Sequence, residues 1–249
     1  MAVSQNRSES TALSPGYSCE RVRFPAPDLA LGVDDVIDWD SEQVTSVAAH
    51  VQALAGHDEV AIVARLFAWV RDEIAFDMAP DVQSRSSWAA SNTIERRWGF
   101  CQQKAIALVA LCRASGIPAV LVYQSVIDAR MPDSFEKYLP GKRMDPHGLA
   151  AVHVGGCWQR LDPTIHREMS RRAGLRNVEW RPGSDALLPE TDVHGDPHCS
   201  IEYEHEVSIT LPEWVVDATL QLPFLHDPDF LSIAARHGER VSKLPRRSD

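Results

Sequence analysis

The sequence contains no long apolar run. No stretch of its 249 residues approaches the roughly 20 consecutive apolar residues that a membrane-spanning helix needs. Residues 1–14 are polar and include no apolar core of a secretory signal peptide. We therefore expect no membrane partner, and the cytoplasm as the location of the protein.

An excess of basic residues is also absent. The chain has 25 lysines and arginines against 35 aspartates and glutamates, a formal net charge of −10. Proteins that bind polyanions display clustered positive charge, and here the basic residues are scattered apart from short pairs. This balance argues against nucleic acid as a partner.

The cysteines do not form a recognisable framework. There are five, which is an odd number, and they are widely spaced without a C-x-x-C pair, so neither a disulfide scaffold nor a zinc ribbon is indicated. A local group of His194, His198, Cys199 and His205 fits no standard zinc spacing. We expect no metal and no cofactor.

The chain is 44% hydrophobic, enough for one enzyme-sized domain. Residues 1–17 are rich in polar side chains and are predicted to be a flexible leader, with a single domain over 18–249. Local patterns predict helices at 41–55, 60–75, 88–97, 213–222 and 227–237, and strands at 19–31, 119–127, 148–154, 157–161 and 200–211. Between two of these strands, the long polar segment 128–146 is interpreted as a lid or substrate-binding loop.

Cys101 is placed at the start of a further helix. Gly99 breaks the preceding pattern, and the following run at 105–112 has no polar side chain, so this helix is predicted to be buried. A thiol attacks as its thiolate, and the unpaired N–H groups at a helix start favour that anion. The alternative for such a cysteine is an inert core thiol, as expected for Cys112.

A hairpin relates two further candidate residues. The two glycines at 155–156 are a strong signal for a two-residue turn that pairs Val154 with Cys157. Continuing this register places Leu149 opposite Asp162. Side-chain alternation then brings residue 147 to the same face as residue 149.

His147 and Asp162 are therefore diagonal neighbours, with Cβ atoms about 7 Å apart or somewhat less. His153 shares the face, but its partner Trp158 lies roughly 13 Å along the strand from Asp162. His147 is the better base, because a carboxylate on one imidazole nitrogen leaves the other to accept a thiol proton. Taken singly, each residue is better explained as part of an ordinary structure, His147 as the cap of a strand and Asp162 as the start of an Asp-Pro turn.

These residues together resemble bacterial transglutaminase-like proteins, in which the order is Cys, His, Asp. The resemblance covers about residues 60–165 and leaves 166–249 as a C-terminal extension. It is carried by Phe67 to Ile74, Arg96-Arg97-Trp98-Gly99-Phe100-Cys101, Arg113-Ala114-Ser115-Gly116-Ile117-Pro118-Ala119, His147 and Trp158-Gln159-Arg160-Leu161-Asp162-Pro163-Thr164. It implies an α+β papain-like core, with the nucleophile helix packed on an antiparallel sheet, and assigns the catalytic roles to Cys101, His147 and Asp162.

The predicted function is a cysteine-dependent acyl transfer through a thioester, acting on an amide, a peptide or a thioester. The substrate can be a small molecule, a peptide or a protein. A hydrolase of the protease type is favoured. One alternative is an amide-forming acyltransferase or transglutaminase of a biosynthetic pathway, and another is a non-catalytic binding module on the same fold.

Overall fold

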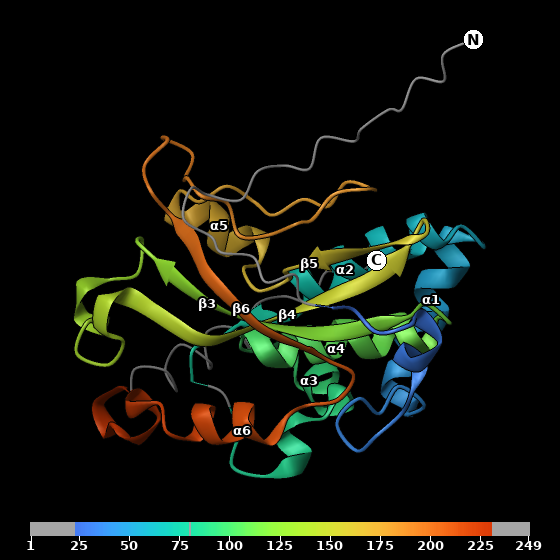
Figure 1. Cartoon of the computed structure of the whole chain (residues 1–249), viewed down its shortest axis with the longest axis horizontal. Helices are drawn as coiled ribbons and strands as arrows, with labels where there is room; N and C mark the ends of the chain where they lie inside the picture. The colour runs from blue at the N-terminus through green and yellow to red at the C-terminus, as the bar shows by residue number, and fades with distance from the viewer. Residues whose placement is uncertain (1–22, 80, 231–249) are drawn as a thin grey trace.

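The computed structural model describes residues 23–79 and 81–230 (Figure 1). Its helices and strands, in chain order, are α1 (Glu42–Ala55), α2 (Glu59–Glu73), β1 (Ala75–Phe76), α3 (Ala90–Arg96), β2 (Trp98–Gly99), α4 (Cys101–Ala114), β3 (Ala119–Asp128), β4 (Arg143–Val154), β5 (Cys157–Leu161), α5 (Arg167–Ala173), β6 (Cys199–Ser208) and α6 (Glu213–Leu220). Within the described ranges, no helix has the length and apolar content to cross a membrane.

Four strands form a curled antiparallel sheet in the order β5-β4-β3-β6. The β4–β5 ladder pairs Val154 with Cys157 and His153 with Trp158, which confirms the predicted register. The ladder ends at the pair Ala150 and Leu161, because the N–H of the next residue, Asp162, donates to the carbonyl of Ala186 instead.

Helix α4 lies along β3 and β4, and helices α1, α2 and α3 surround it (Figure 1). Each side chain from Cys101 to Arg113 is buried, which confirms the prediction of a buried helix. Burial of one leucine- or isoleucine-sized side chain stabilises a fold by about 1.5–3 kcal/mol. The α+β architecture expected from the resemblance, a helix beginning at the cysteine and packed on an antiparallel sheet, is therefore confirmed.

The opposite face of the sheet is covered as well. Val120, Val122, Leu149 and Ala151 form a second, smaller apolar cluster with Ala30, and Phe24 and Trp158 stack over it with ring centroids 5.2 Å apart. Burial on both faces explains why the middle strands have continuous apolar runs instead of strict alternation.

Some element boundaries differ from those expected. Strand β4 begins at Arg143, five residues before the predicted start, because the long β3 continues to pair with it, so the connecting loop shortens to 129–142. The strand expected over 19–31 is wrong in its described part, where Pro27–Leu31 is a 3-10 helix opened by its proline. The expected leader 1–17 and most of the expected helix 227–237 lie outside the described residues.

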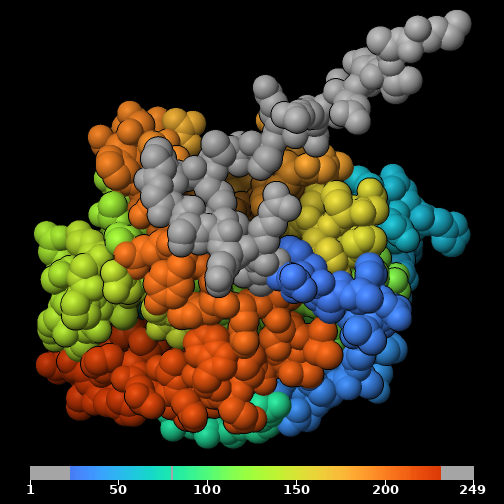
Figure 2. Space-filling model, viewed as in Figure 1, coloured from blue at the N-terminus to red at the C-terminus, as the bar shows by residue number. Residues whose placement is uncertain are grey.

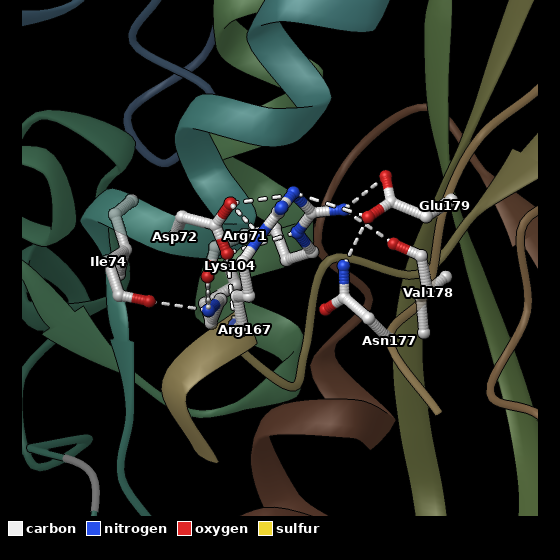
Figure 3. A network of polar contacts seen from close by, with 8 residues as sticks. All are labelled: Arg71, Asp72, Ile74, Lys104, Arg167, Asn177, Val178 and Glu179. Carbon is white, nitrogen blue, oxygen red and sulfur yellow. Dashed lines mark hydrogen bonds and ion pairs between the residues drawn. The ribbon is translucent and has the colours of Figure 1, made fainter. Parts of the chain in front are cut away.

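One buried cation, Lys104, connects α4 to the end of α2 (Figure 3). Nζ of Lys104 donates to the carbonyls of Arg71 and Ile74 at 3.0 and 2.5 Å, where the last turn of α2 leaves carbonyls without helical partners. Burial lowers the pKa of Lys104 to about 7, although Asp72 and Asp162 act in the opposite direction. The nucleophile helix is thus joined to the chain just before β1.

The guanidinium of Arg71 continues this network towards the C-terminal half (Figure 3). It donates to the carbonyl of Val178 at 2.5 Å and pairs with Asp72 and Glu179 at 2.6 and 3.0 Å. Arg167 pairs with the same two carboxylates. Residues 167–179 are therefore held against α2.

We expect Lys104→Met to change how the free energy of unfolding depends on pH. The pKa of Lys104 is about 7 in the folded protein, against roughly 10.4 in an unfolded chain. Between these values the unfolded state binds more protons, so the wild-type free energy of unfolding should rise with pH across this window and fall again as pH drops through it. Urea unfolding of both proteins measures this, and equal pH slopes would contradict the low pKa.

Candidate active site

Cys101 is the first residue of α4, and the residues before it position it. Phe100 is extended, and the side chain of Gln103 closes the helix start: its Oε1 accepts from the N–H of Phe100 at 3.4 Å, and its Nε2 donates to the carbonyls of Asp81 and Ser87 at 2.9 Å each. The parallel β1–β2 pair, which joins Phe76 to Gly99, holds this segment beside the end of α2. The first N–H groups of α4 lack helical partners and can stabilise a negative charge at this point.

His147 and Asp162 are in direct contact. The Nε2–H of His147 donates to Oδ2 of Asp162 over 2.7 Å, and both side chains are almost completely buried. The other carboxylate oxygen accepts from the N–H of Thr164 at 2.9 Å. The carboxylate is held from two sides, so it fixes the orientation of the imidazole.

The second imidazole nitrogen, Nδ1, is the one that Asp162 leaves unoccupied. Nδ1 of His147 is buried and makes no hydrogen bond of good geometry within the described part of the chain. Burial alone lowers the pKa of His147, but the charge of Asp162 and the interaction with the thiol of Cys101 together raise it well above its ordinary value. For Asp162 the two effects have the opposite signs. Burial by itself raises the pKa of this carboxyl group, and the interaction with His147 brings the pKa below its usual range. This electrostatic pattern favours an imidazolium beside the Asp162 carboxylate.

A close backbone approach brings the helix start to the histidine. A Cβ at Gly148 would lie 2.9 Å from Cα of Gln102 and 2.7 Å from its Cγ, so only glycine fits. Nε2 of Gln102 donates to the carbonyl of Pro146 at 2.9 Å, and its Oε1 accepts from the hydroxyl of Thr219 on α6 at 3.0 Å. Gln102, the residue after the cysteine, is thus bonded to Pro146, the residue before the histidine.

Three of the four tryptophans upstream of the cysteine, Trp69, Trp88 and Trp98, make contacts away from it. The indole N–H of Trp88 donates to the carbonyl of Val82 at 3.3 Å. Trp69 and Trp98 lie under the guanidinium groups of Arg97 and Arg96, 4.5 and 4.7 Å from the ring centroids. These contacts give the three tryptophans packing roles.

Two further histidines, His205 and His198, lie close to carboxylates. His205 contacts Asp145 at 2.5 Å, whereas His198 is buried near Asp128. In residues 23–79 and 81–230, no three histidine, cysteine or acidic side chains are grouped so that they could hold a metal ion. His153 packs against Trp158, with ring centroids 5.3 Å apart, and is not part of the pair formed by His147 and Asp162.

A helix beginning at a cysteine, packed on an antiparallel sheet beside a histidine–aspartate pair, defines a papain-like α+β architecture. Residues 45–163 match the family described as the Transglutaminase-like superfamily. The matched segment contains Cys101, His147 and Asp162, and the match confirms the resemblance that the sequence motifs predicted. No curated protein matches the chain.

Several solved structures are similar to the chain. A proposed cysteine protease from Cytophaga hutchinsonii is 18% identical over 73% of this chain and 55% of its own, with a TM-score of 0.40. The periplasmic domain of TgpA from Pseudomonas aeruginosa is 19% identical over 53% of this chain and 48% of its own, with a TM-score of 0.37. The chain thus spans about half the length of these structures.

The motifs led to Cys101, His147 and Asp162, and the structure brings all three together. Sequence reasoning missed the residues that align them, namely Gln102 and Gly148. The only local signal was a glycine inside a buried strand, which often marks a close backbone approach. Nothing in the local sequence indicated that Gln102 lies opposite it.

We expect Gly148→Ala to separate the helix start from β4, because the added Cβ would overlap the backbone of Gln102. A misplacement of about 1 Å can cost about 10²-fold in rate. The alkylation rate of Cys101 by iodoacetamide, followed by peptide mass spectrometry, should fall by roughly this factor. The matched control is Gly32→Ala, which meets nothing within 4 Å. Equal loss in both variants would contradict the proposed contact.

We expect Asp162→Asn to lower the pKa of His147, because burial then acts without the opposing carboxylate. The C–H resonance of the His147 ring, assigned by its disappearance in His147→Gln, gives this pKa by NMR titration. The exposed Asp196 provides the control Asp196→Asn. An unchanged titration of His147 in Asp162→Asn would show that the carboxylate does not stabilise the imidazolium.

Proposed function

We propose that the chain is a cysteine-dependent acyl-transfer enzyme of the amide or peptide hydrolase type. Cys101 is the nucleophile, His147 the acid and base, and Asp162 the residue that orients His147. The observation that carries this proposal is the shared imidazole: Asp162 occupies Nε2, and Nδ1 is the nitrogen left for the thiol of Cys101. The cytoplasmic location stays a prediction.

In the first step, the thiolate of Cys101 attacks the carbonyl carbon and forms a C–S bond. The imidazolium of His147 gives the proton on Nδ1 to the leaving nitrogen, the C–N bond breaks, and an amine departs from a thioester. Water then attacks the thioester, His147 accepts one of its protons, and the C–S bond breaks, which restores the thiolate and the imidazolium. The carboxylic acid that leaves loses its own proton to the solvent. Asp162 stays ionised throughout and stabilises the charged imidazole.

Relative thiol reactivity tests this proposal sharply, because accessibility alone predicts the opposite order. Cys157 is exposed, whereas only 8% of Cys101 is exposed to solvent. Burial raises the pKa of Cys112 to about 12 and also raises that of Cys199. We expect iodoacetamide to label Cys101 faster than Cys157, and His147→Ala to reverse this order.

The control is Cys157→Ser, which should leave the labelling rate of Cys101 unchanged. Faster labelling of Cys157 than Cys101 in the wild-type chain would refute the proposed nucleophile. A non-catalytic binding module would show the same negative result, together with no acyl adduct on Cys101 by intact mass after exposure to activated esters.

Hydrolysis and amide formation differ in what releases the acyl group. We expect an acyl-enzyme formed on Cys101 to decay in buffer to the free acid, and added amines to speed its loss only in proportion to their ordinary reactivity. Mass spectrometry of the released products measures the partition. Predominant amide formation at low amine concentration would support the acyltransferase alternative.

A further inference from the structure

A small cavity opens beside Cys101, and its walls come from segments far apart in the chain. One part follows α2, one belongs to the loop before β4 and to the start of β4, and one follows α6. Its apolar lining includes Phe76, Met78, Leu139, Met144, Leu222 and Phe224. Any group that occupies this cavity while bonded to Cys101 is surrounded mainly by carbon atoms.

The cavity is narrow. Its volume is about 50 Å³, whereas an apolar cavity of about 150 Å³ holds one benzene molecule of six carbon atoms. By proportion, it accommodates roughly two to four carbon atoms. A short aliphatic group fits, and an aromatic ring does not.

The polar groups of the cavity have partners already. Asp145 is the one carboxylate in the lining, and its two oxygens accept from the hydroxyl of Tyr203 at 2.7 Å and from Nε2 of His205 at 2.5 Å. A polar atom placed among the apolar walls would lose its hydrogen bonds to water without replacement. An anionic group would in addition be repelled by Asp145.

An aromatic cluster maintains the size of the cavity. Phe135 and Tyr138 of the loop pack against Phe224 and Phe230, with ring centroids 5.6 to 6.3 Å apart, and the hydroxyl of Tyr138 donates to Asp227. In Figure 2 this loop, yellow-green, lies against the red C-terminal segment at one end of the molecule. The loop is thus held beside the cavity, to whose wall it contributes Leu139.

We propose that this cavity binds the carbon chain next to the reacting carbonyl, and that the acyl donors of the protein carry a short, uncharged aliphatic group there, such as a propyl or isobutyl group. This inference rests on the proposed function of Cys101 and specifies its substrate class. Cys101 forms the thioester, and Leu139 and Met144 set the length of the acyl chain.

A series of p-nitrophenyl esters tests the preference, because acylation of Cys101 releases p-nitrophenolate as the C–S bond forms. The acyl groups are acetyl, butyryl, hexanoyl, phenylacetyl and methoxyacetyl, and each rate is divided by that of the same ester with free cysteine. Methoxyacetyl has the shape of butyryl but contains an ether oxygen. We expect butyryl to acylate Cys101 at least about tenfold faster than each of the others, the range typical of one misfitted group in an apolar pocket.

Variants that widen the cavity test its identity. Leu139→Ala should move the optimum from butyryl to hexanoyl, and Met144→Ala provides a second route to the same shift if the first variant does not fold. The control is Leu54→Ala, which removes an exposed side chain on α1 and should leave the optimum at butyryl. An optimum that stays at butyryl in both widened variants would overturn the assignment of the cavity.

Iodoacetamide labelling of Cys101 separates this inference from the proposed function. If Cys101 is labelled faster than Cys157 but the esters acylate it at equal normalised rates, or not at all, the chain-length inference is wrong and the nucleophile stands. If Cys101 is not labelled preferentially, the proposed function itself fails.

Discussion

The contact between Gln102 and Gly148 is the constraint on which the candidate site depends. Helix α4 begins at the cysteine, and β4 contains the histidine, so their separation is set where these two elements touch. The absence of a side chain at Gly148 lets the backbones approach, and the hydrogen bond from Nε2 of Gln102 to the carbonyl of Pro146 holds them there. The hydroxyl of Thr219 on α6 fixes the other end of the Gln102 amide. A proton transfer over hydrogen-bonding distance tolerates little change in this spacing.

Buried polar side chains reinforce the same arrangement from the other side of α4. Lys104 donates to the carbonyls at the end of α2, and Arg113 donates to the carbonyls of Gly32, Ala119 and Ile209 at the opposite end of the helix. Each cation satisfies carbonyls that end an element or lie in a loop, which would otherwise be buried without partners. The helix is therefore positioned by directed bonds as well as by apolar packing, which has no direction of its own.

Burial also determines the strength of the interaction between His147 and Asp162. Because His147 and Asp162 are both buried, their mutual attraction is stronger than it would be in water. Together with the interaction between His147 and Cys101, this attraction outweighs the burial that would otherwise keep the imidazole neutral. The cavity beside Cys101 extends this apolar environment to the substrate, so one physical feature supports both the proposed mechanism and the proposed acyl specificity.

The sequence by itself determined what depends on local patterns. The apolar run at 105–112 required a buried helix, Gly99 placed its start near Cys101, and the turn at 155–156 set the register that makes His147 and Asp162 neighbours. Only the tertiary structure decided how these parts face one another. The partner of Gly148, the carbonyls around Lys104 and the walls contributed by Leu222 and Phe224 all come from distant segments, and no local periodicity records which distant segments will meet.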